Sequence, residues 1–142
     1  MRRAALAALL WWALAAVSPA CAEVLRFRAE LRPAAETPAR ASPAMGVAEV
    51  TLDTDSRIMS WRVRYAGLGT PVVAARFLWP REPGAGVAGD LEFAPPYRSP
   101  IVSSARLNDI QVGDLRAGLW SVELVTRKHP NGEWRGDLQR AR

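Results

Sequence analysis

The residue types that most often carry chemistry are scarce in this sequence. It holds one histidine, His129, and one cysteine, Cys21, among its 142 residues. Zinc and copper sites usually take three or four imidazole or thiolate ligands, which this chain does not supply. A catalytic His129 would also need a nucleophile or an acid beside it, whereas Pro130-Asn131-Gly132 predicts a turn directly after it. We therefore expect a structural role for His129 and no cofactor.

Two further groups of polar residues have an ordinary structural interpretation. Asp53 and Asp55 could offer oxygen ligands to a hard cation, but Asp53-Thr54-Asp55-Ser56 is also typical of an Asx turn, which we favour. Ser103 and Ser104 have no histidine or acid motif around them, which argues against a hydrolase triad. These patterns favour a protein that is not an enzyme.

The composition is that of one small globular domain. Hydrophobic residues make up 49% of the chain and charged residues 23%, which is typical of an ordered soluble domain and not of a disordered one. The length allows one full core, and a lone cysteine excludes an internal disulfide framework. Two domains are therefore excluded.

The first 22 residues have the features of a secretory signal peptide. Arg2 and Arg3 precede an apolar run over residues 4–17, and Ala20-Cys21-Ala22 matches a small-residue cleavage site. The run is shorter than the roughly 18 residues that a membrane-spanning helix needs. We expect cleavage after Ala22, export to the periplasm or beyond, and one domain over residues 23–142. The alternative is a lipoprotein anchored through Cys21.

The charge balance gives little support to nucleic-acid binding. The chain has 19 basic and 14 acidic residues, a net charge of +5, and loses two arginines and no acid with residues 1–22. The remaining excess of +3 is spread over many positions, and Glu133 and Asp137 interrupt the basic stretch after Arg127. We expect no nucleic-acid partner.

Alternating hydrophobicity predicts strands along most of the domain. Residues 24–31, 46–52 and 57–67 place apolar side chains on one parity and polar ones on the other. Further strands are expected at residues 72–79, 87–93 and 119–126, with a last strand ending near Leu138. Prolines break residues 32–45 and 94–100 into connections.

One helix is expected, over residues 105–117. Leu107, Ile110 and Leu115 are spaced as one helical face, with Ser104 as the cap and Gly118 as the stop. About seven or eight short strands joined by turns, with a single helix, predict an all-β Greek-key sandwich or barrel, immunoglobulin-like in outline.

Three sequence blocks resemble the chordin-type (CHRD) domain family. They are Phe27-x-Ala29-x-Leu31 followed by Glu36-Thr37-Pro38, then Gly46-x-Ala48, and above all the block from Thr126 to Leu138. The resemblance spans the domain and implies a sandwich similar to that of copper/zinc superoxide dismutase, without an established reaction. The residues that carry it, which we expect to be structural, are Glu36, Pro38, Gly46, His129, Pro130, Gly132, Glu133, Arg135 and Gly136.

The sequence departs from the family pattern where many members have histidines. Arg76-Phe77-Leu78 stands in place of a His-x-His pair, and Val125 stands in place of another histidine. A guanidinium, a leucine and a valine cannot bind a transition metal, so we predict no metal site here.

Two specific contacts are predicted. Arg135 is expected to form a partly buried bidentate pair with Glu36, which would fix the proline-rich connection to the last strand. Trp79, beside Arg76 and Arg81, is a candidate binding surface, because tryptophan and arginine are frequent in binding hot spots. The alternative for Trp79 is that it closes one end of the barrel.

Taken together, the residues favour an exported, non-catalytic module that binds a protein or another envelope component. The alternative is a metal-binding or redox-active protein of the superoxide-dismutase type.

Overall fold

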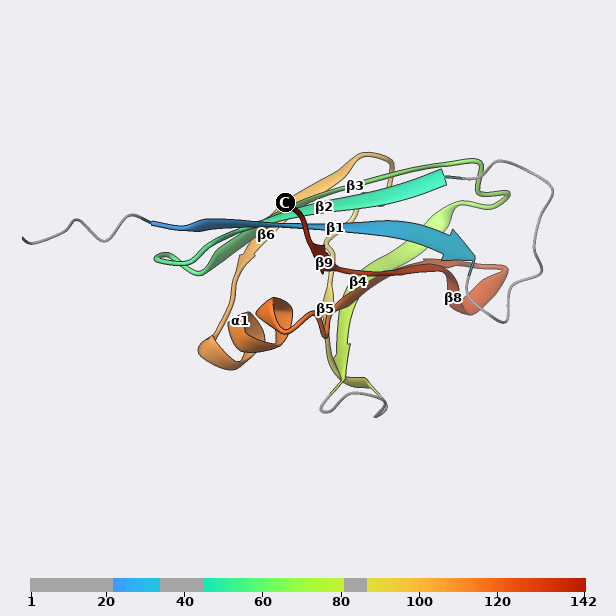
Figure 1. Ribbon diagram of the computed structural model, residues 1–142. Coiled ribbons are helices and arrows are strands. Elements are labelled where there is room, and N and C mark those ends of the chain that lie inside the picture. The colour runs from blue at the N-terminus through green and yellow to red at the C-terminus, as the bar shows by residue number, and fades with distance from the viewer. Residues whose placement is uncertain (1–21, 34–44, 81–86) are drawn as a thin grey trace, which may run out of the picture.

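The computed structural model describes residues 22–33, 45–80 and 87–142. Two layers of antiparallel strands make up this part of the chain, and one short helix lies beside them (Figure 1). Its elements are β1 (Val24–Pro33), β2 (Met45–Asp53), β3 (Ile58–Ala66), β4 (Val72–Pro80), β5 (Val87–Glu92), β6 (Ile101–Arg106), α1 (Asp109–Arg116), β7 (Ser121–Thr126), β8 (His129–Asp137) and β9 (Gln139–Arg140). The all-β prediction is confirmed, with nine strands in the described residues.

The strands form one curled sheet in the order β5-β4-β7-β8-β1-β2-β3-β6, and β9 pairs with β1. The layers meet where Arg32 and Pro33 of β1 pair with Arg135 and Trp134 of β8. The same strand β1 thus belongs to the layer of β2, β3 and β6 for most of its length and joins the other layer at its end. The result lies between a sandwich and a barrel.

Alternation of side chains decides which face of each strand is buried. On β1 every second residue from Leu25 to Leu31 is buried, and on β3 Met59, Trp61 and Val63 are buried. Arginines occupy the opposite parity of both strands, facing water. This is the pattern that the sequence predicts.

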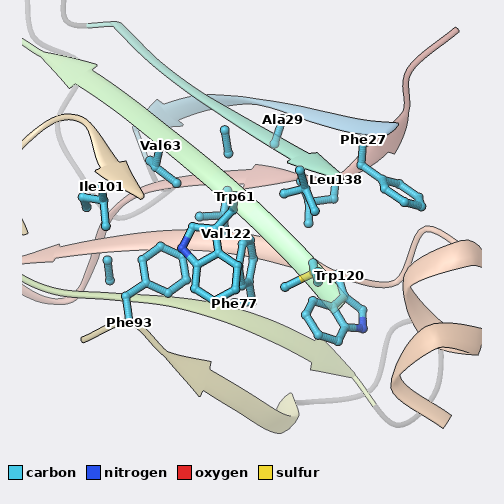
Figure 2. Packing of buried hydrophobic residues seen from close by; sticks show 14 of the residues in the cluster. Phe27, Ala29, Trp61, Val63, Phe77, Phe93, Ile101, Trp120, Val122 and Leu138 are labelled. Carbon is cyan, nitrogen blue, oxygen red and sulfur yellow. The ribbon is translucent and has the colours of Figure 1, made fainter. Parts of the chain in front are cut away.

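Aromatic rings fill the centre between the two layers. Trp61 meets Phe77 edge to face at a centroid distance of 5.2 Å, and Phe93 lies 5.1 Å from Trp61 (Figure 2). Phe77 also contacts Trp120, 5.7 Å away, so that β3, β4 and the residue that precedes β7 share one cluster. Such pairs add to the large apolar area that each ring buries.

The helix prediction is correct in kind and wrong in its start. Residues 105 and 106 belong to β6, and α1 begins at Asp109 because Asn108 caps it in place of Ser104. The Asn108 carboxamide oxygen accepts from the Gln111 backbone N–H at 2.8 Å, and the Gln111 side chain accepts from the Asn108 N–H at 2.9 Å. Ile110 is 76% exposed, so it does not belong to the buried face with Leu115.

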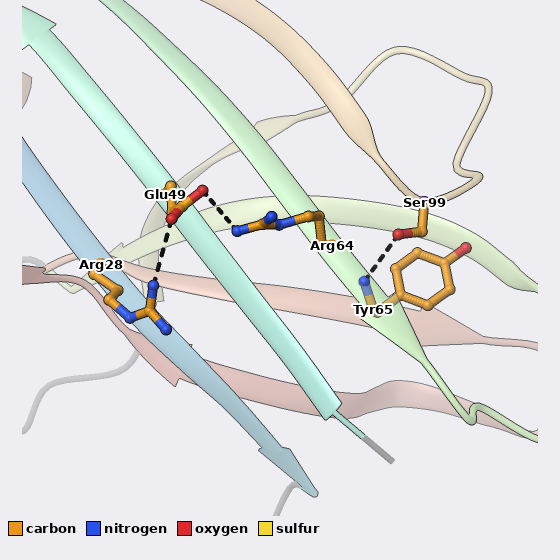
Figure 3. Close-up of polar contacts among 5 residues, drawn as sticks. All are labelled: Arg28, Glu49, Arg64, Tyr65 and Ser99. Atoms are coloured by element: carbon orange, nitrogen blue, oxygen red, sulfur yellow. Dashed lines mark hydrogen bonds and ion pairs between the residues drawn. The ribbon is translucent and has the colours of Figure 1, made fainter.

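The connection over residues 94–100 is fastened to the end of β3. The backbone N–H of Tyr65 donates to Ser99 Oγ at 3.0 Å, as Figure 3 shows. The phenol hydroxyl of Tyr65 donates to the backbone carbonyl of Tyr97 at 2.5 Å. Removal from water raises the pKa of Tyr65. The phenol is therefore a neutral donor at physiological pH.

Candidate functional site

A buried acid, Glu123, lies in the middle of β7. Only 1% of its surface is exposed, and it stands between Arg76 on β4 and Arg135 on β8 in the strand register. Strand pairing therefore places one guanidinium group on each side of the Glu123 carboxylate. We call these three residues the buried triplet.

Both carboxylate oxygens of Glu123 are engaged. Arg76 donates from Nε at 3.0 Å and from Nη2 at 2.7 Å to Oε1, and Arg135 donates from Nη2 to Oε2. The side chains of Arg76 and Arg135 are 29% and 47% exposed, so each guanidinium also reaches water. Two arginines compensate the desolvation of one buried carboxylate, and the triplet keeps one net positive charge.

A bulge in β8 covers the buried triplet. Thr126 pairs with His129, and Leu124 pairs with Trp134. Residues 130–133 of β8 therefore lie opposite a single residue of β7, Val125. Within this bulge Gly132 has φ +102°, and a Cβ there would lie 2.8 Å from Glu123 Cδ. Only glycine fits both this backbone conformation and this close approach.

This bulge corrects the turn prediction. The chain reverses at Arg127 and Lys128, between β7 and β8, whereas Pro130-Asn131-Gly132 lies inside β8. The Asn-Gly pair provides the positive φ that the bulge needs instead of a hairpin turn.

A pocket of about 400 Å³ opens beside the buried triplet. Apart from Leu78 and Pro130, its lining is polar. It is lined by Arg76, Leu78, Asp90, Glu123, Pro130, Asn131 and Arg135.

A second set of one glutamate and two arginines lies on the outer face of the other layer. Glu49 on β2 accepts from Arg28 Nη1 on β1 at 3.4 Å and from Arg64 Nη2 on β3 at 3.0 Å (Figure 3). The Glu49 side chain is 45% exposed. We call these three residues the exposed triplet. Its charges are solvated, unlike the Glu123 carboxylate.

Asp53 forms the Asx turn that the sequence favours. Its Oδ1 accepts from the backbone N–H groups of Asp55 at 2.9 Å and Ser56 at 3.0 Å. The bond from Ser56 is the main cause that lowers the pKa of Asp53. Within residues 22–33, 45–80 and 87–142, no three His, Cys, Asp or Glu side chains are grouped to hold a metal.

A family model of the CHRD domain matches residues 27–138, almost the whole strand-forming region. The chain belongs to the CHRD-domain family. Neither a curated protein nor a solved structure matches this chain. None of the helices described in this CHRD-domain protein is long and apolar enough to cross a membrane.

The CHRD motif residues of the last block are gathered around the buried triplet and the β1–β8 junction. His129 begins β8, and its backbone N–H donates to Thr126 Oγ1 at 3.3 Å. Gly136 is required where β8 meets β1, since a Cβ there would lie 2.4 Å from the Glu30 carbonyl oxygen. On β2, the buried Gly46 pairs with Leu31 of β1.

Several predicted residues lie outside the described part of the CHRD domain. These are Glu36, Pro38 and Arg81, together with the side chain of Glu133, whose backbone is in β8. The predicted pair of Arg135 with Glu36 is therefore untested. The partner that the structure gives Arg135 is Glu123.

The candidate surface of Arg76 and Trp79 is divided between two faces of β4. Arg76 joins the buried triplet, whereas Trp79 lies three positions later, and strand alternation turns it to the inner face. The Trp79 ring is half-buried and stacks on Trp120 at 4.7 Å, over Gly89 of β5. A role of Trp79 in binding stays a prediction.

Glu123 is the residue that sequence reasoning missed. It is the only charge in the strand from Ser121 to Thr126, and Arg76 is the only charge in the apolar strand from Val72 to Trp79. Two lone, opposite charges in otherwise apolar strands predict a buried pair, and that signal was available.

Proposed function

We propose that this CHRD-domain protein is exported and acts as a non-catalytic binding module in the bacterial envelope. The observation that carries the proposal is the contrast between its two sets of charges. Inside, Glu123 is held by two arginines; outside, arginines with free donors stand on the strand faces.

The state of Glu123 supports a non-catalytic role. A general acid or base must exchange its proton with a substrate, and a metal ligand must offer a free lone pair. Three of the roughly four lone-pair sites of Glu123 accept from Arg76 and Arg135, and only 1% of its surface is exposed, which leaves a substrate or metal little access to it. The buried triplet therefore joins β4, β7 and β8, and binding falls to the surface.

Export is tested by the mass of the protein recovered from an expressing bacterium. Cleavage after Ala22 gives a protein that begins at Glu23 in the exported fraction, and Ala22→Arg should block this cleavage. Full-length protein that stays in the cytoplasm contradicts the proposal. A diacylated Cys21 would replace a free exported protein by an anchored one.

Binding is tested by co-sedimentation with washed envelope fragments at 0.15 M NaCl. We expect the purified protein to be retained, and absence of retention contradicts a binding function. Elemental mass spectrometry of the natively purified protein provides the second arm. Stoichiometric copper or zinc would contradict the non-catalytic proposal and favour redox chemistry.

A further inference from the structure

The outer face of β1, β2 and β3 contains a hollow of about 550 Å³. Its floor carries the short side chains of Thr51 and Ser60, and its walls carry Arg26, Arg28 and Arg62. The residues that line it include one acid, Glu49. Positive charge is therefore concentrated around a floor of hydroxyl groups.

Two of these arginines have no ionic partner in the part of the chain that the structure describes. Glu49 stands opposite Arg62 in the register, but its oxygens accept from Arg28 and Arg64 instead. Neither Arg26 nor Arg62 forms an ion pair or a side-chain hydrogen bond with any described residue. Their donors are thus available to a ligand that carries negative charge.

A second hollow, of about 750 Å³, adjoins the first and shares Arg28 and Ala141 with it. It adds Arg32, Arg140 and Arg142, together with the acids Glu30 and Asp137. Arg32 and Arg140 form exposed ion pairs with Glu30 and Glu23, each at 3.3 Å, which a ligand in solution can displace. Arginines therefore extend from β3 across β1 to β9, farther than a single small anion needs. This extent fits a chain with repeated negative charges.

From this charge pattern we infer that the two adjoining hollows bind an anionic polysaccharide, which carries phosphate or carboxylate groups. The inference rests on the proposed binding function and names its partner. Guanidinium groups bind phosphate and carboxylate through paired hydrogen bonds, and the Thr51 and Ser60 hydroxyls can exchange hydrogen bonds with sugar hydroxyls.

The surface chemistry distinguishes a polysaccharide from the other polyanions. Single-stranded nucleic acids stack their bases on exposed aromatic rings, and the large exposed hydrophobic residues in the described part include no aromatic. An acidic protein would be expected to anchor through several exposed apolar side chains, and of the large exposed hydrophobic residues described, Val102 alone lines this hollow.

The test is biolayer interferometry of the purified protein on four immobilised polymers, at 0.05 and 0.3 M NaCl. The probes are polygalacturonate, a phosphate-bearing mannan, neutral dextran and single-stranded DNA. We expect binding to at least one of the first two, weakened by salt, and none to dextran. Preference between polygalacturonate and the phosphate-bearing mannan identifies the anionic group as carboxylate or phosphate.

The decisive variant is R26Q/R62Q, with R116Q/R127Q as the control of equal charge. Arg116 and Arg127 are exposed and lie outside both hollows. We expect about a tenfold loss of affinity for R26Q/R62Q and less than about a twofold loss for the control. Thermal unfolding should be unchanged in both variants, because none of the four arginines has an ionic partner among the residues that the structure describes.

Three results would overturn the inference. They are absence of binding to both anionic glycans, an equal loss in the two double variants, or tighter binding to DNA than to either glycan. If the protein is retained on envelope fragments but binds no anionic glycan, this inference is refuted and the proposed binding function stands. Loss of that retention as well would refute the proposed function.

Discussion

The buried triplet and the exposed triplet use the same chemistry in opposite surroundings. In each, one glutamate on a central strand accepts from arginines on the two neighbouring strands. Glu123 is 1% exposed and Glu49 is 45% exposed. The comparison therefore isolates the effect of burial on an Arg–Glu–Arg arrangement within one protein.

Burial changes what such an arrangement can do. The Glu123 carboxylate has given up its hydration, so each arginine that it holds is needed to offset that loss. The Glu49 carboxylate keeps water, and its contacts are worth little. A buried triplet fixes strands relative to one another, whereas an exposed one leaves its arginines free to exchange partners with a ligand.

The largest expected effect is that of Glu123→Gln. The neutral amide leaves two guanidiniums without their anion, and we expect a loss of about 3 kcal/mol in the free energy of unfolding. The value is at the low end for a buried pair because Arg76 and Arg135 reach water. Urea unfolding followed by tryptophan fluorescence measures it.

A double substitution provides the control for this prediction. Arg76→Met combined with Glu123→Leu removes the buried charge together with its more buried partner, and should cost less than Glu123→Leu alone. If Glu123→Leu alone costs no more stability than the double substitution, Arg76 and Glu123 do not offset the cost of each other's burial. The comparison of the two triplets then fails.

Trp79→Ala measures how much an apolar contact on one face of β4 stabilises the fold, for comparison with the charged Arg76–Glu123 contact on the other face. Trp79 stacks on Trp120 from the opposite face of β4 to Arg76, and its removal should cost about 2 kcal/mol of unfolding free energy. The same urea titration measures this loss. An unchanged stability together with lost retention on envelope fragments would show that Trp79 contacts a partner instead of closing the core.

Gly132→Ala tests whether the bulge in β8 protects the buried triplet. The residue has φ +102°, and the new Cβ would meet the Glu123 carboxyl group, so we expect a loss of about 1.5 kcal/mol. Gly113→Ala in α1 is the matched control, because a Cβ there meets nothing within 4 Å. That change should raise stability slightly, by up to about 1 kcal/mol, through helix propensity.

Seven of the nine described strands could be predicted from the sequence because burial on one face imposes a period of two, whereas β6 and the two-residue β9 were missed. The start of the helix and the chain reversal at Arg127 could not be predicted, because for each the sequence offers two local signals and tertiary contacts select one of them. Ser104 and Asn108 can both cap a helix, and pairing of β6 with β3 decides for Asn108. The Asn-Gly pair suits a hairpin turn or a bulge, and the position of Glu123 favours the bulge.

The candidate site was harder to predict because strand register brings its residues together. Arg76, Glu123 and Arg135 are separated by 47 and 12 positions, and only the order β4-β7-β8 makes them neighbours. Arg135 and Arg76 were both singled out from the sequence, but for different partners. The lone charges of Arg76 and Glu123 in apolar strands indicate a buried pair, but a single sequence gives no direct measure of the register that adds Arg135 to it.

Glu49→Gln has the smallest expected effect on stability, and we expect it to lower stability while it raises affinity for an anionic glycan. Stability should fall by less than about 0.5 kcal/mol, and high salt should reduce even this loss, because the pairs with Arg28 and Arg64 are solvated. Affinity for an anionic glycan should rise, because Glu49 is the acid among the residues lining the first hollow. A stability loss as large as that of Glu123→Gln would mean that exposure does not distinguish the two triplets. A weaker affinity would mean that Glu49 positions Arg28 for the ligand instead of competing with it.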